Sequence, residues 1–164
     1  MSAERRVTLQ MAVIEGHQLV QLLDDLIDLL GVDRDPSDTA IERLTPSAYP
    51  DDDEAARAFR SATADDLIDR RRTDAVTVRT TIASSLPGAE AASEEDAFAQ
   101  TEVMATSSDL DAWMRTLTAL RLVIADRLGI EYDDEHDPDD PRYGVYDWLG
   151  YRLELVVQAA DRLD

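Results

Sequence analysis

The two histidines are the first candidates for a chemical role, because one of them lies among acidic residues. His17 follows Ile14 by three residues and has no second His or Cys at metal-ligand spacing, which is typical of a surface histidine. Acidic residues alternate around His136 like the oxygen ligands of a calcium loop: Asp133, Glu135, Asp137 and Asp139. The central glycine of such a loop is missing, Pro138 interrupts it, and no glutamate closes it. The pattern favours a solvated acidic loop at 131–140 over a cation site.

Carboxylate clusters are the next candidates, because paired carboxylates can transfer protons as general acid and base. The clusters fall on helix faces opposite the apolar positions: Asp24, Asp25 and Asp28, and Asp65, Asp66 and Asp69. Acid–base work requires a cleft that desolvates one carboxylate, and the sequence indicates none. Phosphate-binding glycine loops, nucleophile elbows, paired zinc histidines and dinucleotide fingerprints are also missing. We therefore predict a non-enzymatic protein without cofactor or metal; an uncharacterised enzyme or small-molecule binder is the remote alternative.

The main basic feature is the run from Arg70 to Arg72. Helical spacing places Asp66 four residues before Arg70 and Asp69 three before Arg72, which predicts intrahelical ion pairs. Arg71 instead falls in the apolar register between Ile68 and Ala75, so we expect it to reach an acidic group on another helix or on a partner. These pairings are favoured over a nucleic-acid patch.

Two further arginines, Arg121 and Arg152, lie among apolar neighbours and need carboxylate partners if they are buried. Three acids could supply them: Asp111, Asp147 and Glu154. Alternatively, both arginines and Trp148 line a groove for an acidic peptide or a small anion. The predicted partner-contact or groove residues are Arg71, Arg121, Tyr146, Trp148 and Arg152.

Helices must position these side chains, because apolar residues recur at spacings of three and four through most of the chain. The long helices are expected at about residues 11–30, 63–86, 107–128 and 143–163, with short extra helices at 39–44 and after the acids at 51–54. Gly31 and Gly129 stand where left-handed C-caps belong. A minor strand pair between residues 7–9 and 103–105 is a weaker prediction. The fold class is an all-α, single-domain helical bundle of about four long helices.

Length and charge restrict the remaining options. The 164 residues suffice for one domain, 1–164, with acidic connecting loops at 87–106 and 129–142. The net charge of −20 repels phosphate backbones, which argues against direct binding to nucleic acid. The chain contains no cysteine, which excludes disulfides, thiolate ligands and thiol redox switches within it. Neither an export signal nor a membrane span is evident, so a cytoplasmic location is expected.

Several segments together resemble an actinobacterial domain-of-unknown-function family labelled as an oxidative-stress transcriptional regulator (AosR). They are Leu44–Tyr49, Phe59-Arg60, Leu67-Ile68, Trp113–Leu117, Leu120–Leu122, Tyr146–Leu149 and Leu153-Glu154. The resemblance covers nearly the whole chain and consists mostly of core and helix-contact residues. It implies a regulator of the stress response, acting on transcription directly or through a partner such as a sigma factor or a proteolysis component.

The chain's own residues favour the indirect role. Oxidation sensing through a cysteine pair cannot operate here, and DNA binding needs a basic face that one arginine run does not provide. We therefore expect a non-enzymatic regulatory or adaptor protein with a protein partner; a direct DNA-binding regulator is the alternative. A homodimer is expected if Trp113 or Trp148 is exposed beside Leu or Val residues.

Overall fold

The computed structural model describes residues 4–45, 53–87, 94–130 and 136–163, without some side chains near the start of the longest helix. Over these ranges the chain forms six α-helices, one 3₁₀ helix and two strands. Their order is β1 (Arg6–Ala12), α1 (Val13–Leu29), α2 (Thr39–Leu44), α3 (Asp53–Ala83), α4 (Glu94–Ala97), β2 (Gln100–Thr106), α5 (Ser107–Leu128), η2 (Pro141–Tyr143) and α6 (Gly144–Asp161). The predicted mostly helical single domain with a minor strand pair is confirmed.

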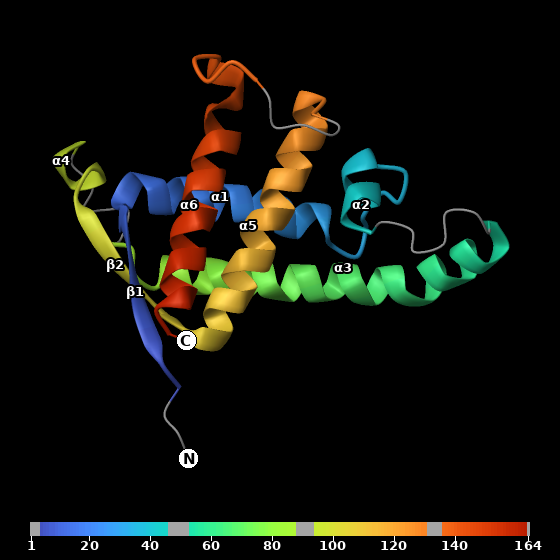
Figure 1. Cartoon of the computed structure of the whole chain (residues 1–164), viewed down its shortest axis with the longest axis horizontal. Helices are drawn as coiled ribbons and strands as arrows, with labels where there is room; N and C mark the ends of the chain where they lie inside the picture. The colour runs from blue at the N-terminus through green and yellow to red at the C-terminus, as the bar shows by residue number, and fades with distance from the viewer. Residues whose placement is uncertain (1–3, 46–52, 88–93, 131–135, 164) are drawn as a thin grey trace.

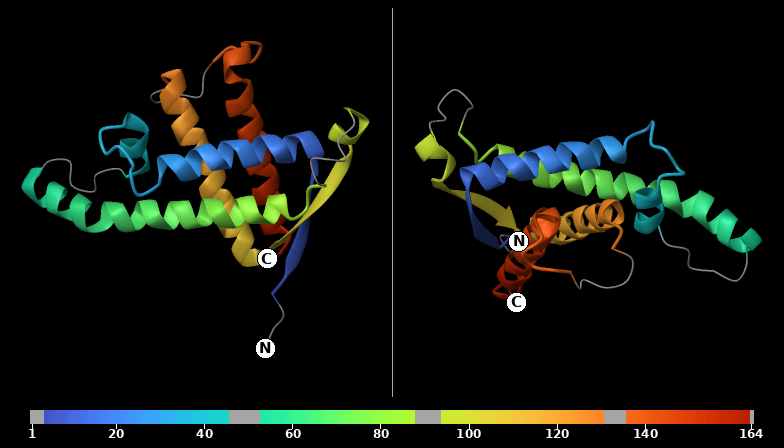
Figure 2. Two further views of the ribbon diagram at one scale, coloured as in Figure 1. Left: turned by 180° about the vertical axis from the view of Figure 1, so that it is seen from behind. Right: turned by 90° about the horizontal axis from the view of Figure 1, so that it is seen from above.

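The four long helices form two antiparallel pairs that cross one another (Figure 1). Helices α1 and α3 run side by side in one layer, and α5 and α6 lie across them in a second layer, as the view from above in Figure 2 shows. The two strands stand at one end of this arrangement, beside the C-terminal half of α6. The start of α3 extends beyond α2 on the opposite side.

The strand pair is antiparallel and in full register, from Arg6 opposite Thr106 to Ala12 opposite Gln100. The predicted pairing is confirmed, but each strand is seven residues long. Along both strands every second side chain is buried: Leu9 and Met11 in β1, and Val103 and Ala105 in β2. One face of the sheet therefore belongs to the core and the other is solvated. Part of the range 87–106, which was predicted to be an acidic connecting loop, instead forms α4 and β2.

A continuous core joins both helix layers and the buried face of the sheet. Its fully buried large side chains include Leu19, Leu23, Ile68, Val78, Ile82, Leu110, Trp113, Leu117 and Leu149. The helical periodicity had placed most of these residues on apolar faces. Val145 and Val157 of α6, which the apolar periodicity of this helix would place in the core, are 45% and 40% exposed. No helix over the described residues has an apolar stretch long enough to cross a membrane.

Two predicted helix boundaries are wrong. We expected a helix to restart at Thr63, but α3 runs without a break from Asp53 to Ala83. Neither glycine nor proline interrupts this segment, so an acidic pair after Thr63 is not enough to end it. Helix α1 is capped by Leu30 rather than by a left-handed Gly31. Gly129, with φ of 76°, does form the predicted left-handed cap of α5.

Candidate partner-binding groove

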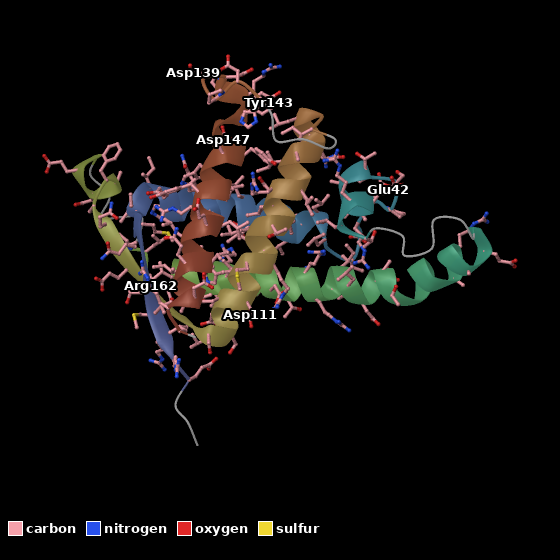
Figure 3. The ribbon with its side chains drawn as sticks, in the orientation of Figure 1. Glu42, Asp111, Asp139, Tyr143, Asp147 and Arg162 are labelled. Carbon is pink, nitrogen blue, oxygen red and sulfur yellow. The ribbon has the colours of Figure 1, made fainter. Side chains whose placement is uncertain are left out.

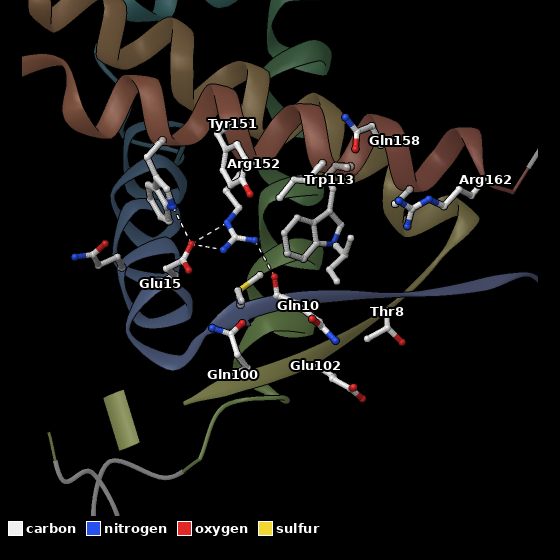
Figure 4. A pocket seen from close by; sticks show the side chains of 17 residues that line it. Thr8, Gln10, Glu15, Gln100, Glu102, Trp113, Tyr151, Arg152, Gln158 and Arg162 are labelled. Carbon is white, nitrogen blue, oxygen red and sulfur yellow. Dashed lines mark hydrogen bonds and ion pairs between the residues drawn. The ribbon is translucent and has the colours of Figure 1, made fainter. Parts of the chain in front are cut away.

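A groove of about 1060 Å³ separates α6 from strands β1 and β2 (Figure 4). We call it the sheet groove. Side chains of α6 form one wall, and Thr8, Gln10, Gln100 and Glu102 of the sheet's solvated face form the other. Its volume is at the upper end of the roughly 300–1000 Å³ typical of small-ligand pockets, and it is open to solvent.

The sheet groove concentrates two side-chain types that are rare in this chain. Both tryptophans line it, and so do four of the five glutamines: Gln10, Gln18, Gln100 and Gln158. The chain contains no asparagine, so nearly all of its side-chain amides gather at this one site. An amide both donates and accepts hydrogen bonds, as a peptide group does. The lining therefore suits an uncharged ligand rich in amides better than a phosphate.

An ion pair crosses one end of the sheet groove. Arg152 of α6 donates to Glu15 of α1 through Nε at 2.8 Å and also through Nη2. Its Nη1 donates to the Gln10 carbonyl of β1 at 2.8 Å, while Trp148 Nε1 donates to the same Glu15 carboxylate at 2.9 Å. One carboxylate thus fixes the positions of the predicted residues Trp148 and Arg152 together.

Glu15 is held in its ionised form by these contacts. Burial alone would raise the pKa of its carboxyl group, but hydrogen bonds from Arg152, Trp148 and the Ala12 amide outweigh it, so the pKa lies below its ordinary value. The bond from the Ala12 amide, at 3.3 Å, also satisfies a free donor at the start of α1. Ala12 has no side-chain acceptor, so only this half of a capping box exists.

Trp113 lies behind the sheet groove, between α6 and β1 (Figure 4). Its side chain is almost completely buried, at 2% exposure, and its Nε1 has no hydrogen-bond partner among the described residues. A buried donor without a partner costs free energy, about 1–3 kcal/mol for a neutral group. Trp148 and the exposed Tyr151 complete the aromatic part of the lining.

The charged residues of the sheet groove balance one another. Its two carboxylates, Glu15 and Glu102, are matched by two guanidinium groups, Arg152 and Arg162. On a chain of net charge −20, such a lining is locally neutral. It attracts neither anions nor cations strongly.

The other predicted groove residues lie elsewhere. Arg121 and Tyr146 do not line the sheet groove; the Arg121 guanidinium lies over the Tyr146 ring, 4.2 Å from its centroid. This is a cation–π contact within the α5–α6 pair. The carboxylates proposed as partners of Arg152 are also wrong, because its partner is Glu15, 137 residues away in sequence.

Arg71 lines a second groove, of about 1030 Å³, between α3 and α5. Its Nε is buried and has no hydrogen-bond partner among the described residues, and burial lowers the pKa of its guanidinium. Asp74 nearby is occupied by Arg115 at 2.8 and 3.2 Å. The intrahelical pairs predicted for Asp66 and Asp69 do not form; Asp69 lies 3.5 Å from Arg34 instead. Arg34, in the loop after α1, contacts both Asp65 and Asp69 and so competes with the intrahelical partners for these acids.

His136 belongs to an aromatic cluster at the N-terminal end of α6. Its Nε2 lies 2.7 Å from Asp147 Oδ1, and its ring stacks on Tyr143 at 4.3 Å. Figure 3 shows Asp139, Tyr143 and Asp147 together there, at the far end of α6 from Arg162. Asp133 and Glu135 of the acidic loop predicted at 131–140 lie outside the described residues. Within the described ranges no group of three or more potential ligands is placed to hold a metal ion.

A model of the family described as a domain of unknown function, DUF2017, matches residues 1–160. The chain belongs to this family. No curated protein and no solved structure matches the DUF2017 chain. The resemblance noted in the sequence is thus confirmed only in that the chain belongs to a domain-of-unknown-function family, whose description assigns no activity.

Sequence reasoning found two residues of the sheet groove in this DUF2017 domain, Trp148 and Arg152, and missed Glu15 and the glutamines. Glu15 carried one usable signal, its position in the first turn of a helix, where a carboxylate can accept a free amide. The glutamines carried none, because they are scattered over β1, α1, β2 and α6 and only the fold brings them together.

Proposed function

We propose that this DUF2017 domain is a non-enzymatic regulatory or adaptor protein that binds a polypeptide segment of a partner in the sheet groove. The observation that carries the proposal is the joint presence there of four of the five glutamines with the rings of Trp148 and Tyr151, while the buried Trp113 closes the groove from behind. Aromatic rings supply contact area at low entropic cost, and amides pair with a peptide backbone. Tryptophan and tyrosine are also the residue types that dominate binding energy at protein interfaces.

The cellular setting of the proposal comes from the family resemblance. It is a stress-response or proteolysis pathway, with a sigma factor or a component of the proteolytic machinery as the partner. The absence of cysteine supports a role in which another protein senses the oxidant. In that case this chain transmits the signal by binding.

The alternative is direct regulation through DNA binding. It is weakened by the ion pairs that the arginines already form within the chain. Many already pair with carboxylates of the same chain: Arg34, Arg43, Arg79, Arg115, Arg127, Arg142 and Arg152. A guanidinium that contacts an aspartate must give up that contact to neutralise a phosphate. The basic face that DNA needs is therefore costly to assemble.

Site-specific photo-crosslinking tests the proposal. A benzophenone amino acid replaces Tyr151, which is 58% exposed and lines the sheet groove; the control places it at Val32, which is 97% exposed and outside the groove. In cells of the native organism we expect a discrete protein adduct from position 151 and none from position 32. Equal adducts from both positions would mean that the groove has no special role.

A titration of the purified protein with mixed-sequence duplex DNA at low salt tests the alternative of direct DNA binding. Phosphate-driven binding is strongest under these conditions, and we expect none below micromolar concentration. Submicromolar binding that survives Trp148→Ala would favour the DNA-binding role.

A further inference from the structure

Strand β1 has one free edge, and its orientation follows from the pairing. Ser107 donates to the Arg5 carbonyl, and Val13 donates to the Ala99 carbonyl, so odd-numbered residues of the first strand direct their peptide groups toward β2. In an antiparallel ladder the intervening residues direct theirs away from the partner strand. The even-numbered residues Arg6, Thr8 and Gln10 therefore present their N–H and C=O groups along the free edge.

This edge faces the sheet groove. The Gln10 carbonyl accepts from Arg152 of α6, which shows that the edge groups point toward the helix wall. The Ala12 amide is occupied by Glu15 at the same end. Between that end and the start of the strand, no described residue outside the two-stranded ladder pairs with the N–H of Gln10 or with either peptide group of Thr8.

One end of the open edge is bridged to α6, and the other end is bridged to the residues that follow this helix. Arg152 reaches the Gln10 carbonyl at one end, and Arg5 donates to the Leu163 carbonyl at the other. Five strand residues at about 3.3 Å each span roughly 17 Å. On the opposite wall the helix from Arg152 to Asp161, at about 1.5 Å per residue, spans roughly 14 Å, and Leu163 lies just beyond it. The length of edge between the two bridges thus matches a strand of about five residues.

We propose that an extended, uncharged segment of a partner protein pairs with the free edge of β1 as a third strand of the sheet. This inference rests on the proposed function and specifies how the partner is held. Main-chain hydrogen bonds to the N–H and C=O of Thr8 and to the N–H of Gln10 provide the pairing, as in other cases of strand addition. The neutral lining selects an uncharged segment, since an acidic one meets the repulsion of a chain of charge −20 and a basic one finds no unpaired carboxylate apart from Glu102.

The test is a pair of substitutions at Thr8 that differ in one hydrogen-bond donor. Thr8→Pro removes the edge N–H, and because this N–H points away from β2 the ladder is kept. Thr8→Val keeps the N–H and removes only the hydroxyl. The probes are uncharged peptides selected from a phage-displayed library of random dodecapeptides against the wild-type domain. We expect Thr8→Pro to weaken peptide binding at least about tenfold and Thr8→Val to change it less than about twofold.

Amide hydrogen exchange on the unmodified protein provides a second measurement that does not depend on the proline variant folding. Added peptide should slow exchange at the Thr8 amide and leave Leu9, already in the ladder, unchanged. Peptides that bind without protecting Thr8 and bind Thr8→Pro equally would overturn strand addition while leaving a peptide-binding function intact. Failure to select any peptide, together with no crosslink from position 151, would overturn both. Protection of Thr8 that rises with protein concentration alone would show that a second copy occupies the edge.

Discussion

Removal of the Glu15 carboxylate is expected to loosen the whole end of the sheet groove. Glu15 accepts hydrogen bonds from Trp148, Arg152 and the Ala12 amide, which belong to α6 and to the junction of β1 and α1. In Glu15→Ala the Arg152 guanidinium loses its carboxylate while its side chain, 13% exposed, remains largely buried. The variant therefore leaves a charge without its counter-ion in a poorly solvated position.

The magnitude follows from the burial of the pair. Removing one partner of a buried ion pair costs about 3–5 kcal/mol, whereas an exposed pair contributes roughly 0–1 kcal/mol. The Glu15 side chain is 25% exposed, so part of the penalty is relieved by solvent. We expect the free energy of unfolding to fall by about 2–3 kcal/mol, which lowers Tm by roughly 4–12 °C for a domain of this size.

Chemical denaturation followed by tryptophan fluorescence measures the effect. The matched control is Asp24→Ala, which removes an ion pair with Arg79 whose side chains are 39% and 50% exposed. This control should cost no more than about 1 kcal/mol. A double-mutant cycle of Glu15 with Arg152 should give a coupling energy of about 1.5–3 kcal/mol. Equal losses for Glu15→Ala and Asp24→Ala, or a coupling near zero, would refute the view that this pair positions the groove.

Three further expectations concern stability. Gly129→Ala should destabilise the domain by about 1–2 kcal/mol, because the φ of 76° at Gly129 is left-handed. Gly144→Ala should stabilise the domain by about 0.5 kcal/mol, because a Cβ at this position meets open space. Thermal unfolding of the two variants should show Tm shifts of opposite sign. Thr106→Ala should cost about 1 kcal/mol in denaturant unfolding, since Thr106 caps α5 by accepting from the Asp109 amide at 3.1 Å. Glu15→Gln should lose more stability at pH 7 than at pH 3. The lowered pKa of Glu15 stabilises the folded state above its ordinary value near 4.5, and this contribution decreases as pH falls toward and through the folded-state pKa. A pH-independent difference between wild type and Glu15→Gln would contradict that assignment.

Much of the fold followed from local patterns in the sequence. Helix α5 shows why: its apolar residues repeat from Leu110 to Leu120, Thr106 begins it and Gly129 ends it. The strands carried a weaker signal, three alternating residues, and only their mutual pairing fixed the longer extent from Arg6 to Ala12. Where prediction failed, as at Thr63, a new helix was expected to begin inside a long segment free of glycine and proline, and one continuous helix was more stable.

The sheet groove could be predicted from the sequence only in small part, because contacts between residues far apart in the sequence form it. Arg152 pairs with the carboxylate of Glu15, 137 residues earlier, although acidic residues such as Glu154 are much closer to it in sequence. The nearby Glu154 lies on the exposed side of α6, where it cannot reach the guanidinium's buried side. Amide side chains have neither charge nor periodicity to indicate a site. Their significance is evident only when four elements bring them to one opening.

The acidity of the chain and the neutrality of the sheet groove together have a consequence for association. A partner that approaches experiences the field of a chain of net charge −20, which salt screens over about 8–10 Å at physiological ionic strength. Within the groove two carboxylates and two guanidinium groups leave no net charge, so main-chain and amide hydrogen bonds there respond little to salt. Salt should therefore act mainly on the association rate, while dissociation of a groove-bound segment stays nearly constant. A dissociation rate that rises steeply between 0.1 and about 0.5 M NaCl would instead indicate that surface ion pairs, rather than strand addition at β1, hold the partner.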